Sequence, residues 1–346
     1  MIPIHPPCPA APRRQPPRLV LVVALAAALT APSLSAAQGP LRVVATTAMV
    51  ADVARAVGGA CVEVVTLMGP GIDPHLYRAS AGDVDRLARA ELIVHNGLGL
   101  EGQLGAVLER LASRVPTLAV AERAAEAAAA AAEATDGLLE GEDAYAGRSD
   151  PHLWLDPRLW AFGAAPMADA IAARRSDCAD AARANAAAYV AALHAVDAWA
   201  RASFATVPEE RRVLVTSHDA FRYFGRAYGL AVHGIEGIST ESEASIADIR
   251  ETADLVVATR VPAVFVETTI SPRTIEAVQA AVRDRGADVA IGGALFGDAM
   301  GDAGTPEGTI VGMLRHNVAT IVNGLGGVAA PWPAELDDLL EEGGAP

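Results

Sequence analysis

Residues 178–205 read CADAARANAAAYVAALHAVDAWARASFA and contain neither glycine nor proline. Alanine dominates the run and has the highest helix propensity of all residues, so the stretch predicts one continuous helix. At about 1.5 Å per residue such a helix is roughly 40 Å long, enough to run past two lobes of a globular protein. We therefore predict that residues 178–206 form a rigid connector between two parts of the chain.

Short β-rich runs alternate with longer helical runs on both sides of this connector. The pattern is typical of α/β proteins with parallel sheets, and it predicts two βα-repeating lobes of similar size, at residues 38–177 and 207–330. The expected strands are LRVVATT (41–47), VEVVTLM (62–68), ELIVHNG (91–97) and PTLAVAE (116–122) in the first lobe, and RRVLVTSH (211–218), LAVHGIEG (230–237), AVFVETT (263–269) and ADVAIGG (287–293) in the second.

The first 37 residues have the features of a secretory leader. Arginines at positions 13, 14 and 18 precede an apolar run over 19–34, and Ser35-Ala36-Ala37 supplies small residues for cleavage. We expect cleavage after Ala37 and export to the periplasm. Gln38, not a cysteine, follows the expected cleavage point, so we expect no lipid anchor, and nothing later in the chain reads as a membrane span.

Two segments depart from the βα pattern. Residues 122–148, ERAAEAAAAAAEATDGLLEGEDAYAGR, are rich in alanine and acidic residues and have no clear apolar face after the first turns. We predict a mobile acidic loop there, within the first lobe. Residues 331–346 are acidic and flanked by proline. We predict that they form a loosely attached tail.

The cysteines that remain after the leader are Cys61 and Cys178. They lie far apart in the sequence, which is a poor basis for predicting a disulfide even in an exported protein. Cysteine is often a small buried apolar residue. We therefore expect two buried free thiols.

The charge of the chain is strongly negative. Lysine is absent, and 27 basic residues face 42 acidic ones, for a formal net charge of −15. Such a field repels nucleic acid and anionic membrane surfaces and attracts cations. We expect no nucleic-acid partner.

Four residues in predicted loops or at strand ends combine into a candidate metal site. The tripeptide Asp-Pro-His occurs at 73–75 and again at 150–152, which gives His75 and His152. His218 ends a predicted strand, and Asp298 lies in a glycine-rich loop after another. Ligands of open α/β sheets bind beyond the carboxyl ends of the strands, where these residues are expected.

Three imidazoles and one carboxylate are a suitable ligand set for Zn²⁺. The proline before His75 and His152 restricts each loop, so less entropy is lost when the histidine is ordered around an ion. Asp73, Asp150 and Asp156 are candidates to accept the second imidazole N–H. By spacing alone, each histidine is equally compatible with a hydrogen-bonded loop or core residue.

The remaining polar candidates have weaker support. Glu267, at the end of a predicted strand, is a candidate for lining the pocket. The other histidines of the mature chain are expected to be structural: His95, His194, His233 and His316. Tyr223 belongs to an aromatic helix face that we assign to the core.

Several separated motifs, in order, resemble one known family. They are GPGIDPHLYRASAGDVDRLARAELIVHNGLGLE, DPHLWLDPRLW, RRVLVTSHDAFRYFGRAYGL, GISTESEASIADI and IGGALFGDAMGDAGTPEGTIVGMLRHNVATIV. Together they cover about residues 41–325 and closely resemble the TroA/ZnuA-type solute-binding proteins of metal ABC transporters, the TroA-like branch most of all.

The resemblance implies two Rossmann-like lobes bridged by one long helix, with a metal ion in the cleft between them. Carried over position by position, the ligands fall on His75, His152, His218 and Asp298. Members of the family deliver zinc or manganese, sometimes iron, to a membrane permease driven by an ATPase. The resemblance thus implies extracytoplasmic metal capture, without an organic cofactor and without catalysis, and we expect a monomer.

The resemblance leaves the metal open between Zn²⁺ and Mn²⁺. Zinc-specialised members often carry a histidine-rich loop, whereas residues 122–148 contain no histidine. Affinity at a nitrogen-rich site favours Zn²⁺ over Mn²⁺, so we prefer zinc slightly. The alternatives are a binding protein for a metal chelate or siderophore and, less favoured, a secreted zinc metalloenzyme, for which no HExxH motif is present. An additional role in adhesion or as a metal reservoir stays open.

Overall fold

The computed structural model describes residues 1–12, 39–131 and 149–341. The chain divides into two compact units, Met1–Gln38 and Gly39–Pro346. In the first unit, residues 1–12 contain neither helix nor strand, and the expected apolar run and cleavage point lie outside the described residues. Within the described part of the chain, no helix combines the length and the apolar character that crossing a bilayer requires.

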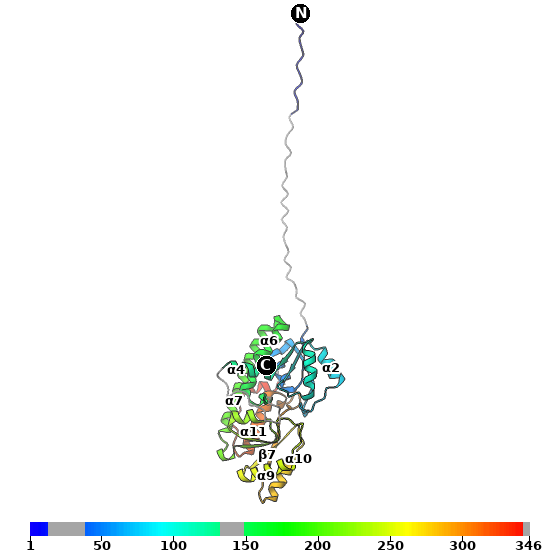
Figure 1. Ribbon diagram of the computed structural model, residues 1–346. Helices are drawn as coiled ribbons and strands as arrows, with labels where there is room; N and C mark the ends of the chain where they lie inside the picture. The colour runs from blue at the N-terminus through cyan, green and yellow to red at the C-terminus, as the bar shows by residue number, and fades with distance from the viewer. Residues whose placement is uncertain (13–38, 132–148, 342–346) are drawn as a thin grey trace. The chain divides into compact units, whose positions relative to one another are not determined.

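The first lobe contains a four-stranded parallel sheet with the order β2-β1-β3-β4. Central strand β1 is almost entirely buried, whereas edge strand β2 alternates between half-buried and exposed residues, as expected for a parallel sheet whose centre is covered on both faces. The strands are β1 (Leu41–Ala45), β2 (Val62–Thr66), β3 (Leu92–His95) and β4 (Thr117–Ala119); the helices are α1 (Ala48–Gly58), α2 (Ala81–Ala88), α3 (Gly105–Ala112), α4 (Val120–Ala130), α5 (Pro157–Ala161) and α6 (Ala164–Arg174) (Figure 1).

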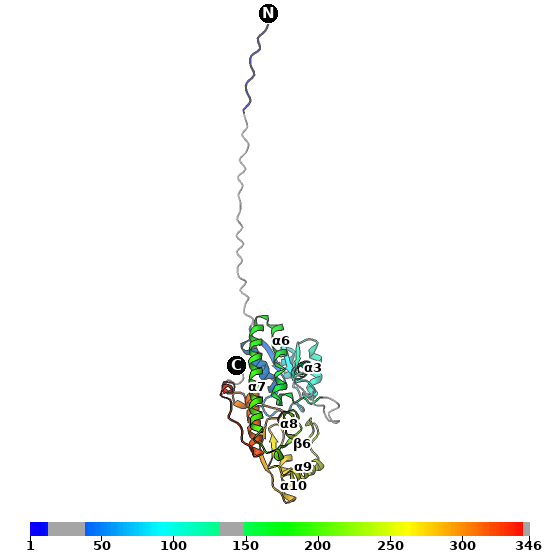
Figure 2. The ribbon, with the colours of Figure 1, turned by 90° about the vertical axis from the view of Figure 1, so that its left-hand side faces the viewer.

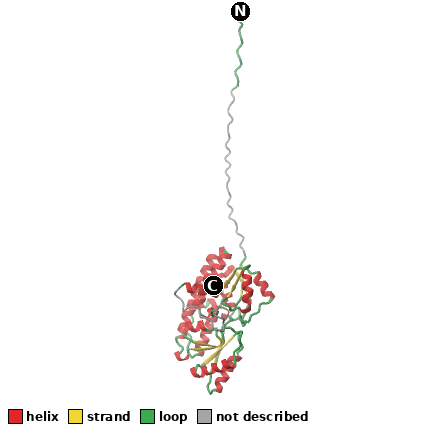
Figure 3. Cartoon of the chain, in the orientation of Figure 1, coloured by secondary structure: helices red, strands yellow, loops and turns green. Residues whose placement is uncertain are grey.

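The second lobe repeats the βα alternation, and Figure 3 shows its strands as a separate group with helices around it. Its strands form two parallel hydrogen-bonded pairs, β5 with β6 and β7 with β8, in place of one continuous ladder, although β5 and β7 lie next to each other. The strands are β5 (Val213–His218), β6 (Ala231–Glu236), β7 (Ala263–Glu267) and β8 (Ala290–Leu295); the helices are α8 (Arg222–Tyr228), α9 (Ile246–Thr259), α10 (Arg273–Asp284) and α11 (Ile310–Gly324). All the strands expected in the two lobes are present.

Helix α7 (Ala179–Phe204) is a single helix of 26 residues, which confirms the predicted connector. It packs on α1 and α6 of the first lobe and on α8 and α11 of the second, and Figure 2 shows it running past both. Buried apolar side chains of both lobes form one continuous cluster around it. Polar contacts add to this packing, because the Tyr189 hydroxyl donates to Asp52 of α1 over 2.8 Å and Arg201 donates to the Ala227 carbonyl of α8 over 2.9 Å.

The prediction of a mobile acidic loop over residues 122–148 is wrong for the first part of this range. Helix α4 extends to Ala130, with Ala124 and Ala128 buried on one face. The small alanine side chains let this face of the helix pack closely against its neighbours, and alanine has a high helix propensity. The rest of the expected loop, residues 132–148, lies outside the described residues.

The expectation of a loose tail is also wrong for the described residues after 331. Trp332 stacks edge-on against Trp199 of α7 with ring centroids 4.7 Å apart, and Arg315 lies over its ring. A short helix, α12 (Asp338–Glu341), follows, and Leu336 and Leu340 are buried. Apolar side chains in an otherwise acidic segment hold it on the second lobe and α7.

Cys61 and Cys178 form a disulfide, so the expectation of two free thiols is wrong. Cys61 ends a 3₁₀ turn after α1, and Cys178 ends another just before α7. Because α1 packs on α7, the two Cα atoms lie 6.2 Å apart despite a sequence separation of 117. The sequence did not reveal the pairing, since only the packing of these helices creates it.

Replacing either cysteine by serine should lower the free energy of unfolding by about 2–5 kcal/mol, because the bridge restricts a long loop in the unfolded chain. Urea denaturation of the oxidised wild type and of Cys61→Ser measures this loss. The double variant Cys61→Ser/Cys178→Ser is the matched control and should lose no more than the single one. A reducing agent that leaves the wild-type midpoint unchanged would contradict the prediction.

Candidate metal centre

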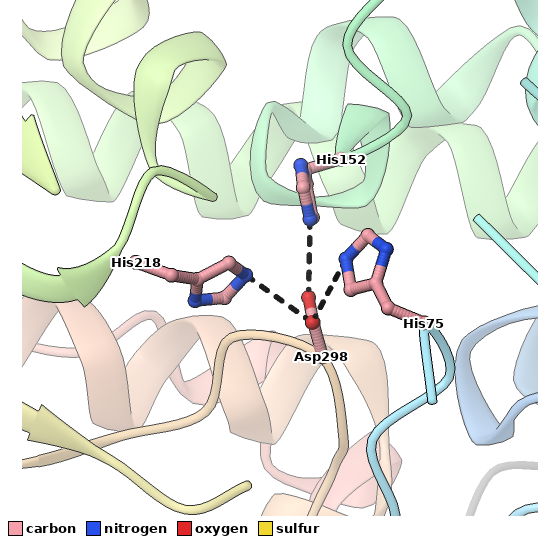
Figure 4. Close-up of side chains that lie close together, drawn as sticks. All are labelled: His75, His152, His218 and Asp298. Atoms are coloured by element: carbon pink, nitrogen blue, oxygen red, sulfur yellow. Dashed lines mark ion pairs between the residues drawn. The ribbon is translucent and has the colours of Figure 1, made fainter. Parts of the chain in front are cut away.

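Four side chains from separate segments meet between the two lobes (Figure 4). His75 lies in the loop after β2, and His152 directly precedes a 3₁₀ turn at Leu153–Leu155. His218 is the last residue of β5, and Asp298 lies in the loop after β8. Their candidate ligand atoms all lie within 4.8 Å of one another, and each residue is at most 2% exposed. The structure thus brings together the four residues selected from the sequence.

The repeated Asp-Pro-His tripeptide has a local structural reason. In the first copy, Oδ1 of Asp73 accepts the backbone N–H of His75 over 2.8 Å. In the second, Oδ1 of Asp150 accepts the backbone N–H of His152 over 3.0 Å. An aspartate side chain that accepts the backbone N–H two residues later forms a tight turn. The proline between them has no backbone N–H, so the turn leaves no donor without a partner at that position. Both copies therefore present a histidine from the same rigid turn.

The three imidazoles direct their Nε2 atoms at the Asp298 carboxylate. Nε2 of His152 lies 3.2 Å from Oδ1, while Nε2 of His75 and of His218 lie 3.3 and 3.2 Å from Oδ2. All three Nε2 atoms and both carboxylate oxygens are buried without a hydrogen-bond partner in the described part of the chain. Buried polar atoms are seldom left unpaired in proteins, so this convergence needs a ligand to explain it.

Carboxylates hold the opposite nitrogen of two of these rings. Nδ1 of His152 lies 2.7 Å from Oδ1 of Asp150, and Nδ1 of His218 lies 2.8 Å from Oε2 of Glu267. Since a carboxylate only accepts, the contact with Asp150 places a proton on Nδ1 of His152, and its Nε2 binds a cation once that nitrogen has lost its own proton. Glu267 also accepts the His218 backbone N–H over 2.9 Å.

Three aspartates were candidates to accept the second imidazole N–H of a ligand histidine, and of these only Asp150 contacts an imidazole nitrogen in the described residues. Asp73 contacts the His75 backbone, and Asp156 caps α5 and pairs with Arg158. Glu267, expected only to line the pocket, is the partner of His218. Its place at the end of β7, beside β5, was the available signal, but the sequence does not give the order of the strands.

Three further contacts that the sequence did not reveal support the site. The Trp154 indole N–H donates to the Gly297 carbonyl over 2.9 Å, which links the His152 segment to the Asp298 loop. The buried Tyr223 hydroxyl donates to the Asp150 carbonyl over 3.1 Å. Gly297 leaves room for Glu267, because a Cβ at this position would lie 2.3 Å from Oε2 unless the Glu267 side chain shifted.

The electrostatics of the site favour an ionised Asp298 and raise the pKa of two of the imidazoles. Burial alone would lower the pKa of His152, but Asp150 and Asp298 outweigh burial and raise the pKa to about 9. Burial likewise opposes the charge of His218, yet Glu267 and Asp298 raise its pKa well above the ordinary value. Burial would raise the pKa of Asp298, but His218 and His152 hold it well below the usual range.

An acidic cleft of about 390 Å³ lies beside the His75 loop. Asp73 and Leu76 line it from the first lobe, and Glu236, Thr240 and Glu243 line it from the second. Burial raises the pKa of Glu236; nearby His218 opposes this, whereas the neighbouring carboxylates add to it. Cavities of about 530 and 600 Å³ lie along α7 instead and contain none of the four candidate ligands.

The other histidines take no part in this group, as expected. His194 is exposed on α7, and Nδ1 of His95 lies 3.8 Å from Glu101. Nε2 of His233 lies 2.9 Å from the Thr252 hydroxyl, and Nε2 of His316 lies 2.9 Å from the Ala294 carbonyl. Among the residues that the structure describes, His75, His152, His218 and Asp298 are the single group found with metal-binding spacing.

Comparison with known proteins agrees with this geometry. The family model of ZnuA, described as zinc-uptake complex component A, periplasmic, matches residues 43–324. The manganese-binding lipoprotein MntA of Bacillus subtilis is 42% identical over 286 residues, which are 82% of this chain and 90% of MntA. The zinc-binding protein TroA of Treponema pallidum is 42% identical over 291 residues, 84% of this chain and 91% of TroA.

The fold also agrees with a solved structure. The periplasmic zinc-binding protein TroA from Treponema pallidum superposes with a TM-score of 0.77 at 42% identity, over 83% of this chain and 99% of that one. The two-lobed α/β architecture expected from the sequence is therefore confirmed. The match to the family model spans both lobes, and with these relatives it shows that the chain belongs to the ZnuA family.

Proposed function

We propose that this protein captures one divalent transition-metal ion outside the cytoplasm and delivers it to the permease of an ABC transporter, whose ATPase drives import. The ligands are His75, His152, His218 and Asp298. The observation that carries the proposal is the convergence of three buried Nε2 atoms and one carboxylate, none of which has a hydrogen-bond partner in the described residues. A cation between them would satisfy all of these atoms at once.

The spacing suits a first-row ion. Two ligand atoms bound at 2.0–2.1 Å in a tetrahedral arrangement lie about 3.3 Å apart. The nitrogen-to-oxygen distances here are 3.2–3.3 Å, with His152 nearest Oδ1 and His75 and His218 nearest Oδ2, and all candidate ligand atoms lie within 4.8 Å of one another. Because both Asp298 oxygens face the imidazoles, the same residues serve a four-coordinate ion through one oxygen or a five-coordinate ion through two. The four-coordinate arrangement suits Zn²⁺, and the five-coordinate arrangement is compatible with Mn²⁺.

The proposal also includes a preference between Zn²⁺ and Mn²⁺. A relative at 42% identity is named for manganese and another at the same identity for zinc. Three imidazole nitrogens bind Zn²⁺ more tightly than Mn²⁺ by the general affinity order of divalent ions. We therefore propose a slight preference for zinc in direct competition, with either ion as the transported cargo and no organic cofactor.

The cellular setting of the protein is a further part of this proposal. We propose that residues 1–37 direct export, that cleavage follows Ala37, and that the mature chain works in the periplasm as a monomer without a lipid anchor. The net charge of −15 supports cation capture and disfavours nucleic-acid partners.

A bare ion fits this site better than the alternatives. The four side chains are at most 2% exposed, so an organic chelator has no access to the ligand atoms while the lobes are in this arrangement. A catalytic zinc usually has three protein ligands and one open position for water, whereas Asp298 supplies a fourth ligand. We propose that the protein has no catalytic activity.

The first test is metal stoichiometry in the wild type and in His218→Ala. The wild type should bind one divalent ion, with Zn²⁺ displacing Mn²⁺ in competition. Removal of one of four buried ligands should weaken binding by at least about 100-fold. Elemental analysis and competition with a chelator measure both quantities. His194→Ala, at an exposed histidine of α7, is the matched control; equal affinity of His218→Ala and the wild type would refute the ligand assignment.

The affinity should depend on pH well above the ordinary imidazole range. With a pKa of about 9, His152 is protonated at pH 7 without metal, and an ion must displace that proton. Affinity should therefore rise about tenfold per pH unit between pH 7 and 8.5 through the proton of His152, and more steeply wherever His218 also loses a proton. Calorimetry in buffers of different ionisation enthalpy counts the released protons. An affinity that is already constant above pH 7 would contradict the prediction.

Glu267→Gln tests the outer carboxylate. Glutamine keeps an acceptor for the His218 backbone N–H but removes the charge that orients the ring. Metal affinity should fall about 10- to 100-fold, as is typical for such partners of metal-binding histidines. Glu276→Gln, on the exposed face of α10, should leave affinity unchanged. If both variants bind zinc like the wild type in the same chelator titration, Glu267 does not orient His218.

A further inference from the structure

A single carboxylate joins the His75 loop to the second lobe. Oδ1 of Asp73 accepts the backbone N–H of His75 over 2.8 Å, and Oδ2 accepts the hydroxyl of Thr240 over 2.6 Å. Thr240 lies in the segment between β6 and α9 and is buried. We propose that Thr240 is a positioning residue: through Asp73 it holds His75 at the metal, so that breaking this contact when the lobes separate frees His75 and releases the ion. The inference rests on the proposed function.

The tip of the His75 loop is anchored by Pro74 and His75, which are buried, and not by the apolar side chains on either side of them. Ile72 and Leu76 are 41% and 53% exposed, so their side chains contribute little packing. The His75 carbonyl lies against Gly102 of the first lobe, where a Cβ would approach it to 2.4 Å. The first lobe thus limits the position of the tip on one side through backbone contact, and Thr240 holds it from the other side through a side-chain hydrogen bond.

The charges around this contact make the hydrogen bond important. Asp73 faces Glu236 and Glu243 of the second lobe across the acidic cleft, with Arg273 as the counter-charge in the cleft lining. Like charges in a partly buried cleft repel, and a bound dication offsets that repulsion. The neutral Thr240 hydroxyl donates to Asp73 without adding a charge to this cleft. Hydrogen bonds to ionised acceptors are among the stronger ones in proteins.

The experiment measures zinc release. The protein is loaded with one equivalent of Zn²⁺ and mixed rapidly with excess chelator. Thr240→Val keeps the shape of the side chain and removes the donor, so release should be roughly tenfold faster, the change expected for one hydrogen bond to a charged group. The rate of zinc association should change less than about twofold, because the ligands themselves are intact. Thr240→Ser restores the hydroxyl and should restore slow release.

Ser239→Ala is the matched control. The Ser239 hydroxyl accepts the Glu241 backbone N–H over 3.3 Å within its own segment, and in the part of the chain that the structure describes it makes no hydrogen bond to the first lobe. This variant should release zinc like the wild type. The metal-free melting temperatures of all variants are compared in parallel, and if Thr240→Val does not fold, Thr240→Ala takes its place.

A double-mutant cycle separates a coupling through Asp73 from a local effect of Thr240. In an Asp73→Ala background, Thr240→Val should cause no further acceleration, because its acceptor is already absent. Wild-type release from Thr240→Val, equal acceleration in Ser239→Ala, or additive effects in the cycle would each overturn the inference. Failure of the wild type to bind any divalent ion would instead overturn the proposed function.

Discussion

Asp298 is a buried carboxylate between three buried imidazoles, and the rest of the site depends on this arrangement. Three imidazoles buried together without an anion would repel one another once they were protonated. Asp150 and Glu267 add two further carboxylates on the outer side of the rings. With neutral imidazoles the cluster has an excess of negative charge that a dication partly cancels. Cation capture is therefore built into the charge balance of the cluster, before any preference among ions.

The two lobes are connected on both sides of this cluster. On the α7 side, buried Asp52 accepts the Tyr189 hydroxyl and, over 3.3 Å, the Ile310 backbone N–H at the start of α11; burial raises its pKa to about 6. Beside the acidic cleft Asp73 accepts the Thr240 hydroxyl, and next to the metal-site residues the Trp154 indole N–H donates to the Gly297 carbonyl. The α7 side is covered by a continuous apolar cluster, whereas the cleft side is acidic. The contacts that join the lobes are therefore mainly apolar along α7 and polar beside His75.

The sequence predicted the fold and the four candidate ligands because both depend on local signals. Alternating β-rich and helical runs marked each strand, and the absence of glycine and proline over 178–205 marked α7. The repeated Asp-Pro-His turns and the strand-end position of His218 pointed to the site. Glu267, Trp154 and Thr240 could not be assigned, since their roles come from contacts between segments far apart in the chain. Cys61 and Cys178 were misjudged for the same reason, and α4 because a run of alanine shows no amphipathic pattern.

The disulfide closes a loop that begins at the end of α1 and ends at the start of α7, and so encloses most of the first lobe. Disulfides form and persist in oxidising compartments and are rare where thiols are kept reduced. The same polypeptide therefore has two stabilities: a lower one while its thiols are reduced and a higher one after oxidation. A chain that reaches its full stability only after oxidation is easier to unfold beforehand, so the order of folding and oxidation decides how long the first lobe stays accessible to unfolding.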